Sequence, residues 1–218
     1  MGASMGNDMG TTRAASWGLI PVLALLAGMA GATETRIPPD DLLAPVSWSA
    51  PDQARFAEAV LLYSNAAREA RGIPPLRADP ALALAASNQA GNMEALRTLS
   101  HRLPIPGAVT YRDRLRALGI PYTRAAENIA LGKLYRLLGR PISRRSQGCA
   151  FTYGDTGAPV PIHSYASLAQ EVVARWLASP GHRASLLSPR YTRVGAGLGV
   201  DPTGAGCGDV YMAQAFAG

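Results

Sequence analysis

Apolar residues recur every three or four positions in three segments of the chain, and this spacing predicts three helices. The first is expected over about 51–71, the second from an Asp79–Pro80 start to about Leu99, and the third over 168–178. The apolar positions are Phe56, Val60, Tyr63 and Ala67, then Leu82, Ala86, Met93 and Leu96, and then Leu168, Val172, Val173 and Trp176. Each apolar face requires another layer of structure to cover it.

Strand-like alternation replaces the helical spacing near the C-terminus. Residues 194–200 and 210–216 alternate as strands do, and a glycine-rich turn over 201–209 joins them. Between the helical segments, 111–118 predicts a short helix and 126–130 a short strand or turn. Helices come first and a hairpin closes the chain, so the expected fold class is α+β rather than a wound parallel sheet.

Two stretches show neither period. Residues 33–50 are rich in proline and aspartate and predict a linker, and 133–167 predict an irregular loop with at most one helical turn. The second stretch carries a basic cluster at Arg136, Arg140, Arg144 and Arg145. The expected organisation is therefore a leader over 1–32, a linker over 33–50 and one domain over 51–218.

Residues 1–32 have the pattern of a secretory signal peptide. The apolar run from Trp17 ends in the small residues 30–32, and it is short for a membrane span. Its basic flank is weak, because Asp8 offsets Arg13, so translation from a later methionine and an uncleaved anchor both remain open. No other stretch is apolar enough to span a bilayer. We expect a periplasmic or extracellular protein that does not span the membrane after signal cleavage.

Composition narrows the function classes. A hydrophobic share of 48% excludes a disordered chain. The net charge of +6 comes almost entirely from arginine and would favour anionic surfaces such as lipid headgroups or cell-wall polymers, although a general Ala/Arg/Gly/Pro bias explains it better. No nucleic-acid-binding motif accompanies the charge, so no nucleic-acid partner is expected.

The chain has three histidines. His101 and His182 each follow a predicted helix, where exposed imidazoles are free to converge on a cleft, whereas His163 is expected at the surface. Ser100 is interpreted as a helix-end hydrogen-bonding residue rather than a partner of His101 in catalysis. No Gly-x-Ser-x-Gly or phosphate-binding glycine motif is present.

Several short motifs, in order, resemble the CAP superfamily (SCP-like, or allergen V5/Tpx-1-related), most of all its bacterial secreted branch. The motifs are Asn65-Ala66-Ala67-Arg68, Ser100-His101, Ala126-Glu127-Asn128-Ile129-Ala130, Ser179-Pro180-Gly181-His182-Arg183 and Gln214-Ala215-Phe216. The resemblance implies a three-layer α-β-α sandwich with a central, mainly antiparallel sheet. It also implies a groove lined by two histidines and acidic residues.

Carried over to this chain, the resemblance makes His101 and His182 the metal-binding imidazoles and Glu127 the first carboxylate, which is also the one candidate catalytic residue. Many relatives have a second carboxylate where Ser179 stands here, and Glu171 is too far along its helix to replace it. Two imidazoles and one carboxylate fall short of a committed zinc site, so weak, exchangeable Zn²⁺ binding is expected. The alternative is a purely structural hydrogen-bonded cluster of these residues.

The resemblance breaks at an insertion over about 133–167, where bacterial relatives have a short connection. It contains Cys149, and the other cysteine, Cys207, lies in the final glycine-rich turn. In an exported protein a Cys149–Cys207 disulfide is expected, contributing roughly 4 kcal/mol by closing a long loop. The insertion is then the expected place for specificity.

Three functions remain open at this point. The first is a secreted, monomeric binding module for a lipid, a small apolar ligand or a cell-surface polymer. The second is a metal-dependent hydrolase or protease, which the missing second acid disfavours. The third is a structural or interaction protein of the cell envelope. Binding is expected before catalysis.

Overall fold

The computed structural model describes residues 37–144, 150–201, 203 and 208–218, and a four-stranded sheet forms its centre. The strand order is β1 (Arg77–Ala78), β5 (Arg193–Asp201), β6 (Asp209–Ala217) and β2 (Ala125–Lys133). Only the β1–β5 pair is parallel, so the sheet is mainly antiparallel, as expected. β2 is a full edge strand rather than the short segment predicted over 126–130.

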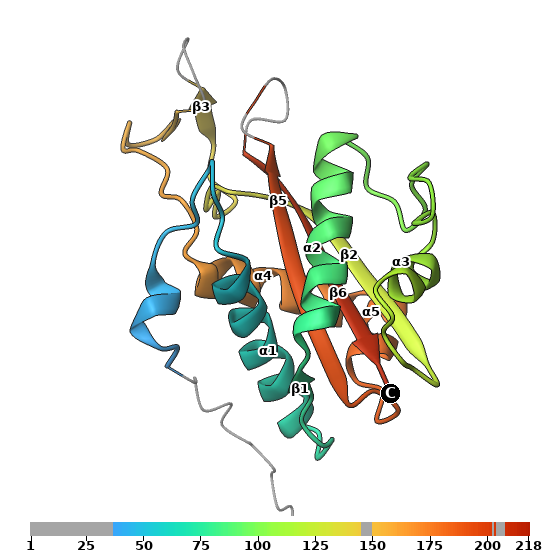
Figure 1. Ribbon diagram of the computed structural model, residues 1–218. Coiled ribbons are helices and arrows are strands. Elements are labelled where there is room, and N and C mark those ends of the chain that lie inside the picture. The colour runs from blue at the N-terminus through green and yellow to red at the C-terminus, as the bar shows by residue number, and fades with distance from the viewer. Residues whose placement is uncertain (1–36, 145–149, 202, 204–207) are drawn as a thin grey trace, which may run out of the picture. The chain divides into compact units, whose positions relative to one another are not determined.

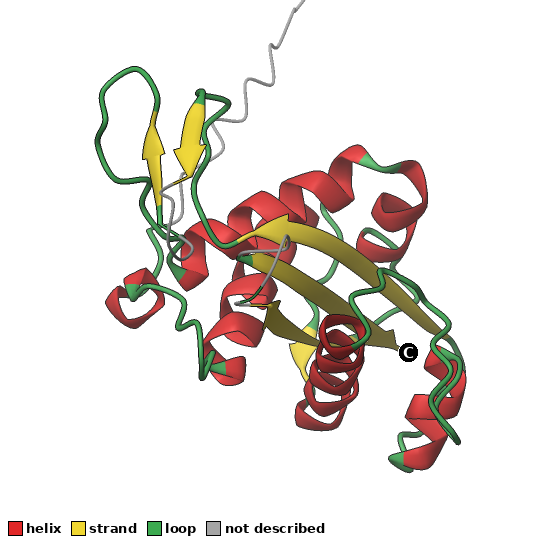
Figure 2. Ribbon diagram, turned by 90° about the horizontal axis from the view of Figure 1, so that it is seen from above, coloured by secondary structure: helices red, strands yellow, loops and turns green. Residues whose placement is uncertain are grey.

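Helices cover both faces of this sheet, which confirms the three-layer sandwich (Figures 1 and 2). The helices are α1 (Gln53–Glu69), α2 (Pro80–Ala95), α3 (Tyr111–Ala117), α4 (Tyr165–Ala178) and α5 (Pro180–Leu186). α2 and α3 pack on one face, and α1, α4 and α5 pack on the other. The segments at 51–71, 111–118 and 168–178 are therefore helices, as predicted.

The alternation of side chains along the strands creates two hydrophobic cores, one on each side of the sheet. Val194, Ala196 and Leu198 of β5 belong to the core shared with α1 and α4. Ala213 and Ala215 of β6 belong to the core shared with α2 and α3. The sheet thus separates the two helical layers, and residues on opposite layers meet only around its edges.

Glycines let α2 approach β5 closely. Gly195, Gly197 and Gly199 occupy alternate positions of β5 and face α2. A Cβ atom at Gly195 would lie 2.0 Å from the Ala83 nitrogen, and one at Gly197 would lie 2.4 Å from the Ser87 nitrogen. The helix backbone therefore occupies the space that side chains would fill, and only glycine fits there.

The start of α2 follows the prediction, and its end does not. The Asp79 carboxylate accepts hydrogen bonds from the Ala81 and Leu82 N–H groups, and Pro80 takes the first helical position. The helix ends at Ala95 rather than near Leu99, because Arg97 adopts a left-handed conformation (φ 48°) and forms an ion pair with Asp201 at 2.8 Å. Leu96 is 43% exposed, so its predicted burial was wrong.

The described part of the expected linker is packed on the domain. A 3₁₀ helix spans Asp40–Leu43, and both Leu42 and Val46 are buried in the core with α1 and α4. The Val46 N–H donates to the His163 carbonyl at 2.9 Å. The linker prediction was wrong for this part, because its few apolar residues are spaced to reach the core even though they show no regular period.

The predicted insertion contains a second, two-stranded sheet. β3 (Ile142–Arg144) pairs antiparallel with β4 (Phe151–Tyr153), and this hairpin lies beyond the ends of the helices in both views (Figures 1 and 2). No helical turn occurs among its described residues before α4, and the two short strands differ from the irregular loop that was predicted.

Two further predictions fall on residues that the structure does not describe. Cys149 and Cys207 lie outside the described residues, as does the expected signal segment over 1–32, so both the disulfide and the signal peptide stay predictions. Among the described residues, no helix has the length and hydrophobicity of a membrane span.

Candidate functional site

The edge strand β2 directs two neighbouring polar residues into opposite layers of the sandwich. Successive side chains of a strand point to opposite faces, so Glu127 and Asn128 point in opposite directions. Glu127 reaches α3 and the loop after α2, whereas Asn128 reaches α5. This dipeptide therefore links the two helical layers at the edge of the sheet.

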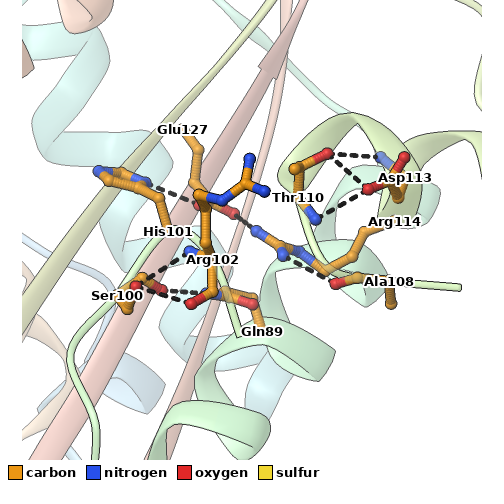
Figure 3. Close-up of polar contacts among 9 residues, drawn as sticks. All are labelled: Gln89, Ser100, His101, Arg102, Ala108, Thr110, Asp113, Arg114 and Glu127. Carbon is orange, nitrogen blue, oxygen red and sulfur yellow. Dashed lines mark hydrogen bonds and ion pairs between the residues drawn. The ribbon is translucent and has the colours of Figure 1, made fainter. Parts of the chain in front are cut away.

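The Glu127 carboxylate lies between a histidine and an arginine, as Figure 3 shows. Its Oε1 is 2.9 Å from His101 Nδ1, and its Oε2 accepts a hydrogen bond from Arg114 Nη2 at 2.5 Å. The side chains of Glu127 and Arg114 are each only 4% exposed, while that of His101 is 47% exposed. The site is a buried ion pair beneath an accessible imidazole.

A short helix holds Arg114 in place. Thr110 and Asp113 form a capping box at the start of α3, with the Thr110 hydroxyl accepting from the Asp113 N–H and the Asp113 carboxylate accepting from the Thr110 N–H. Arg114 Nη1 also donates to the Ala108 carbonyl at 3.3 Å. The sequence interpretation missed Arg114, although its position within the apolar stripe of Tyr111, Leu115 and Leu118 is the signal of a buried arginine that requires a carboxylate.

Hydrogen bonds to the backbone position the loop that carries His101. The Ser100 hydroxyl donates to the Arg102 carbonyl at 2.8 Å and accepts from the Arg102 N–H at 3.1 Å. Gln89, buried on α2, donates to the Ser100 carbonyl at 2.7 Å. The interpretation of Ser100 as a backbone hydrogen-bonding residue is confirmed, and its hydroxyl is not oriented as a nucleophile.

His182 approaches from the opposite layer. Asn128 Nδ2 donates to the His182 carbonyl at 3.2 Å and so ties the first turn of α5 to β2. Burial, together with the positive charge of His101 when protonated, lowers the pKa of His182 below its usual 6.5. At neutral pH the His182 imidazole is therefore neutral and able to act as a ligand.

The expected second acid is absent from this arrangement. Ser179 stands where many relatives have it; this residue ends α4 and precedes α5, and its side chain makes no capping hydrogen bond. Among the residues that the structure describes, no group of three or more His, Cys, Asp or Glu side chains is arranged to hold a metal ion. The arrangement thus offers two imidazoles, and the only nearby carboxylate is already paired with Arg114.

His163 and Glu171 differ from their predictions. His163 was expected at the surface, but its side chain is only 5% exposed. Its backbone N–H donates to the Leu134 carbonyl, which holds the residue against α4. Its Nδ1 lies 2.9 Å from the Ser167 hydroxyl and its Nε2 lies 3.3 Å from Glu171. The hydrogen bond from His163 lowers the pKa of Glu171, so this carboxylate is engaged with His163.

Other residues of the recognised motifs serve the scaffold. Arg68, 1% exposed on α1, donates to four backbone carbonyls. Asn65 pairs with both backbone groups of Leu76, and Trp176 Nε1 donates to the Ile129 carbonyl at 3.2 Å. These residues fix the loops after α1 and α5 and join α4 to β2.

Comparison with known proteins agrees with this architecture. A family model described as "CAP: Cysteine-rich secretory protein family" matches residues 61–216, so the chain belongs to this family. The uncharacterized protein YkwD of Bacillus subtilis is 27% identical over 150 residues, which cover 68% of this chain and 45% of YkwD. The chain therefore spans less than half the length of that relative.

Two solved structures share the fold. An extracellular protein containing an SCP domain from Bacillus anthracis has a TM-score of 0.51 at 21% identity, covering 75% of this chain and 40% of that one. An outer surface protein from Borrelia burgdorferi has a TM-score of 0.52 at 16% identity, covering 76% and 94%. At these identities the likeness concerns the fold alone.

Proposed function

We propose that this chain is an exported binding module in which His101 and His182, with Glu127 hydrogen-bonded to His101, form a weak, exchangeable divalent-cation site rather than a catalytic centre. The observation that carries the proposal is that the two carboxylate oxygens of Glu127 contact Arg114 and His101. Ser179 stands in the place of a second acid, and among the described residues no group of three or more His, Cys, Asp or Glu side chains is arranged to hold a metal ion.

The same contacts argue against a hydrolase. A general base must be free to accept a proton from an attacking water, and a hydrolytic zinc site has three protein ligands plus that water. The Arg114 guanidinium balances the charge of Glu127 and occupies one of its oxygens. Recruiting Glu127 as a ligand would break this buried pair, so the metal is left with two imidazoles and solvent.

Isothermal titration of Zn²⁺ into the purified protein tests the proposal. We expect a Kd on the order of 10⁻⁴ M, equivalent to about −5.5 kcal/mol. His101→Ala and His182→Ala should each abolish it, whereas Glu58→Gln, which alters an exposed carboxylate on α1, should leave it unchanged. A tight stoichiometric site, or metal-dependent cleavage of a peptide or ester panel that both histidine variants lose, would overturn the proposal in favour of a metalloenzyme.

An extracytoplasmic location is part of the proposal. It is supported by the leader pattern of residues 1–32 and by the relatives that are described as extracellular or outer surface proteins. The ligand classes proposed are a lipid, a small apolar molecule or a cell-surface polymer. The lipid is tested by purifying the protein from its native envelope and extracting it with organic solvent. If no lipid is recovered, the small apolar molecule and the cell-surface polymer remain.

A further inference from the structure

A basic groove lies beside the histidine site, between α3 and the end of α5. It has a volume of about 670 Å³, and its wall includes Ala125 at the start of β2 and Ser185 on α5. Four arginines line it, namely Arg112, Arg116, Arg124 and Arg190. His101, Glu127 and His182 are not among its lining residues, so the groove is a separate site.

The arginines of this groove are largely uncompensated. Arg116 pairs with Asp113 at 3.1 Å on the solvent side, where the arginine is 76% exposed, and Arg112 contacts the Tyr111 hydroxyl at 3.2 Å. In the part of the chain that the structure describes, neither Arg124 nor Arg190 has a side-chain ion pair or hydrogen bond, and no acidic residue lines the groove. Four guanidinium groups around one hollow repel each other unless an anion occupies it.

Gly218 lies next to two residues of the groove wall, Thr123 and Arg124. The Gly218 oxygen accepts hydrogen bonds from the Thr123 N–H and hydroxyl, both at 2.8 Å, and from the Arg124 N–H at 3.3 Å. These hydrogen bonds leave the Arg124 guanidinium group free to contact a ligand.

The fold holds these arginines in place from distant parts of the chain. Arg112 and Arg116 are four residues apart on the capped helix α3 and so lie on one side of it. Arg190 lies between Ser188 and Tyr191, whose carbonyls both accept hydrogen bonds from buried Arg68 at 2.9 and 3.2 Å. The backbone of this loop is therefore fixed before a ligand binds, and binding has to order only the arginine side chains.

We infer that this groove binds a phosphate group of an envelope molecule, which names a ligand chemistry for the proposed binding function and rests on it. Guanidinium groups form paired hydrogen bonds with phosphate oxygens, and a phosphate offers enough oxygens for several of them at once. The volume exceeds that of a phosphate, which leaves room for an attached glycerol or sugar. Tyr122 and Tyr191, both half-buried, also line the groove and add aromatic surface to its wall.

Two probes at constant ionic strength test the inference and separate the sources of phosphate. Titration calorimetry with sodium tripolyphosphate measures soluble phosphate, and co-sedimentation with phosphatidylglycerol–phosphatidylcholine vesicles, against phosphatidylcholine alone, measures a lipid headgroup. We expect binding in at least one arm. The double variant Arg124→Gln/Arg190→Gln should weaken it about tenfold or more, with an unchanged circular dichroism spectrum.

The matched control removes the same charge elsewhere. Arg71→Gln/Arg77→Gln alters two exposed arginines near the end of α1 and on β1, and it should leave phosphate binding within about twofold. Equal losses in both double variants would reduce the effect to net charge and overturn the inference, as would absence of binding in both arms. The variant His101→Ala should still bind phosphate. A failed cation site and a failed phosphate groove can therefore be distinguished.

Discussion

Glu127 and Arg114 form a buried ion pair whose two members depend on each other. Removing a charge from water costs several kcal/mol, and only the partner charge and good hydrogen bonds offset this cost. Here the 2.5 Å contact, the Ala108 carbonyl and His101 supply those interactions. Loss of one partner would leave the other charged and buried.

Arg114→Leu should therefore destabilise the protein by about 3–5 kcal/mol, because it strands the Glu127 carboxylate. Urea unfolding followed by circular dichroism measures the free energy of unfolding. The double variant Arg114→Leu/Glu127→Leu should recover most of the loss, since no unpaired charge remains. If Arg114→Leu unfolds at the wild-type urea concentration, the pair has no structural role.

His182 should make stability depend on pH in a narrow window. Because burial, and secondarily His101, lower its pKa in the folded state, the unfolded chain binds a proton first as the pH falls. The contribution is complete above the unfolded value of about 6.5 and is lost as the pH falls from there through the lower folded-state pKa.

The melting temperature should thus fall between pH 7.5 and pH 5.5 in the wild-type protein and fall less in His182→Gln. Differential scanning calorimetry in matched buffers measures both. Carboxylates with lowered pKa values, such as Asp201, lose their contribution to the free energy of unfolding only at more acidic pH. They therefore do not affect the melting temperature between pH 7.5 and pH 5.5. Equal slopes for the two proteins would show that His182 is not desolvated.

At the scale of elements, the packing of α2 on β5 depends on the glycines that face the helix. Gly197→Ala would place a Cβ atom 2.4 Å from the Ser87 backbone, so the helix must move away from the sheet. We expect a loss of about 3 kcal/mol or more in unfolding free energy. Gly91→Ala, on α2 itself, has no atom within 4 Å of the new Cβ and should be neutral or stabilising by up to about 1 kcal/mol. Similar losses in both variants would contradict this account.

Sequence patterns predicted the helices whose start and apolar face can be recognised within one segment of the chain. The Asp79 cap, the proline at position 80 and the apolar spacing of α1, α2 and α4 lie within single segments. β1 and the early end of α2 were not predicted, because each depends on a partner far along the chain. The Arg97–Asp201 contact, for example, joins residues separated by 104 positions. The pair β3–β4 was also missed, although its partners, such as Ile142 and Tyr153, are close in sequence, because the segment shows no regular alternation.

The residues of the histidine site were likewise predicted only in part. The order of the family motifs pointed to His101 and Glu127, and the structure places them in contact. Arg114 and the burial of His163 were missed, because an isolated arginine or histidine in a sequence gives no sign of which carboxylate or carbonyl it will meet. Asn128 belongs to a recognised motif, but its hydrogen bond to the His182 carbonyl of α5 could not be predicted from that motif.

At the scale of the whole molecule, the two helical layers meet at the edges of the sheet. Beyond β5 the Ser87 hydroxyl of α2 donates to Gln53 of α1 at 3.0 Å, and at β2 the residues Glu127 and Asn128 reach opposite layers. The sheet isolates the cores elsewhere, so a site that uses side chains from both layers has to form at an edge. The histidine site and the basic groove both border β2, α3 and α5. A ligand that carries a phosphate could therefore lie next to a cation held by the histidines.

The Cys149–Cys207 disulfide is a prediction about two residues that the structure does not describe. Among the described residues, the Leu134 N–H donates to the Gly208 carbonyl at 2.6 Å, and a Cβ at Gly208 would lie 3.2 Å from the Tyr135 ring. Thiol titration of exported protein under denaturing, non-reducing conditions should find no free thiol. Cys149→Ser/Cys207→Ser should lower the unfolding free energy by roughly 4 kcal/mol, less any strain in the bond, because the unfolded chain regains the entropy of a long open loop. Two free thiols in the exported protein would contradict the bond. Non-covalent contacts, such as that between Leu134 and Gly208, would then position the insertion.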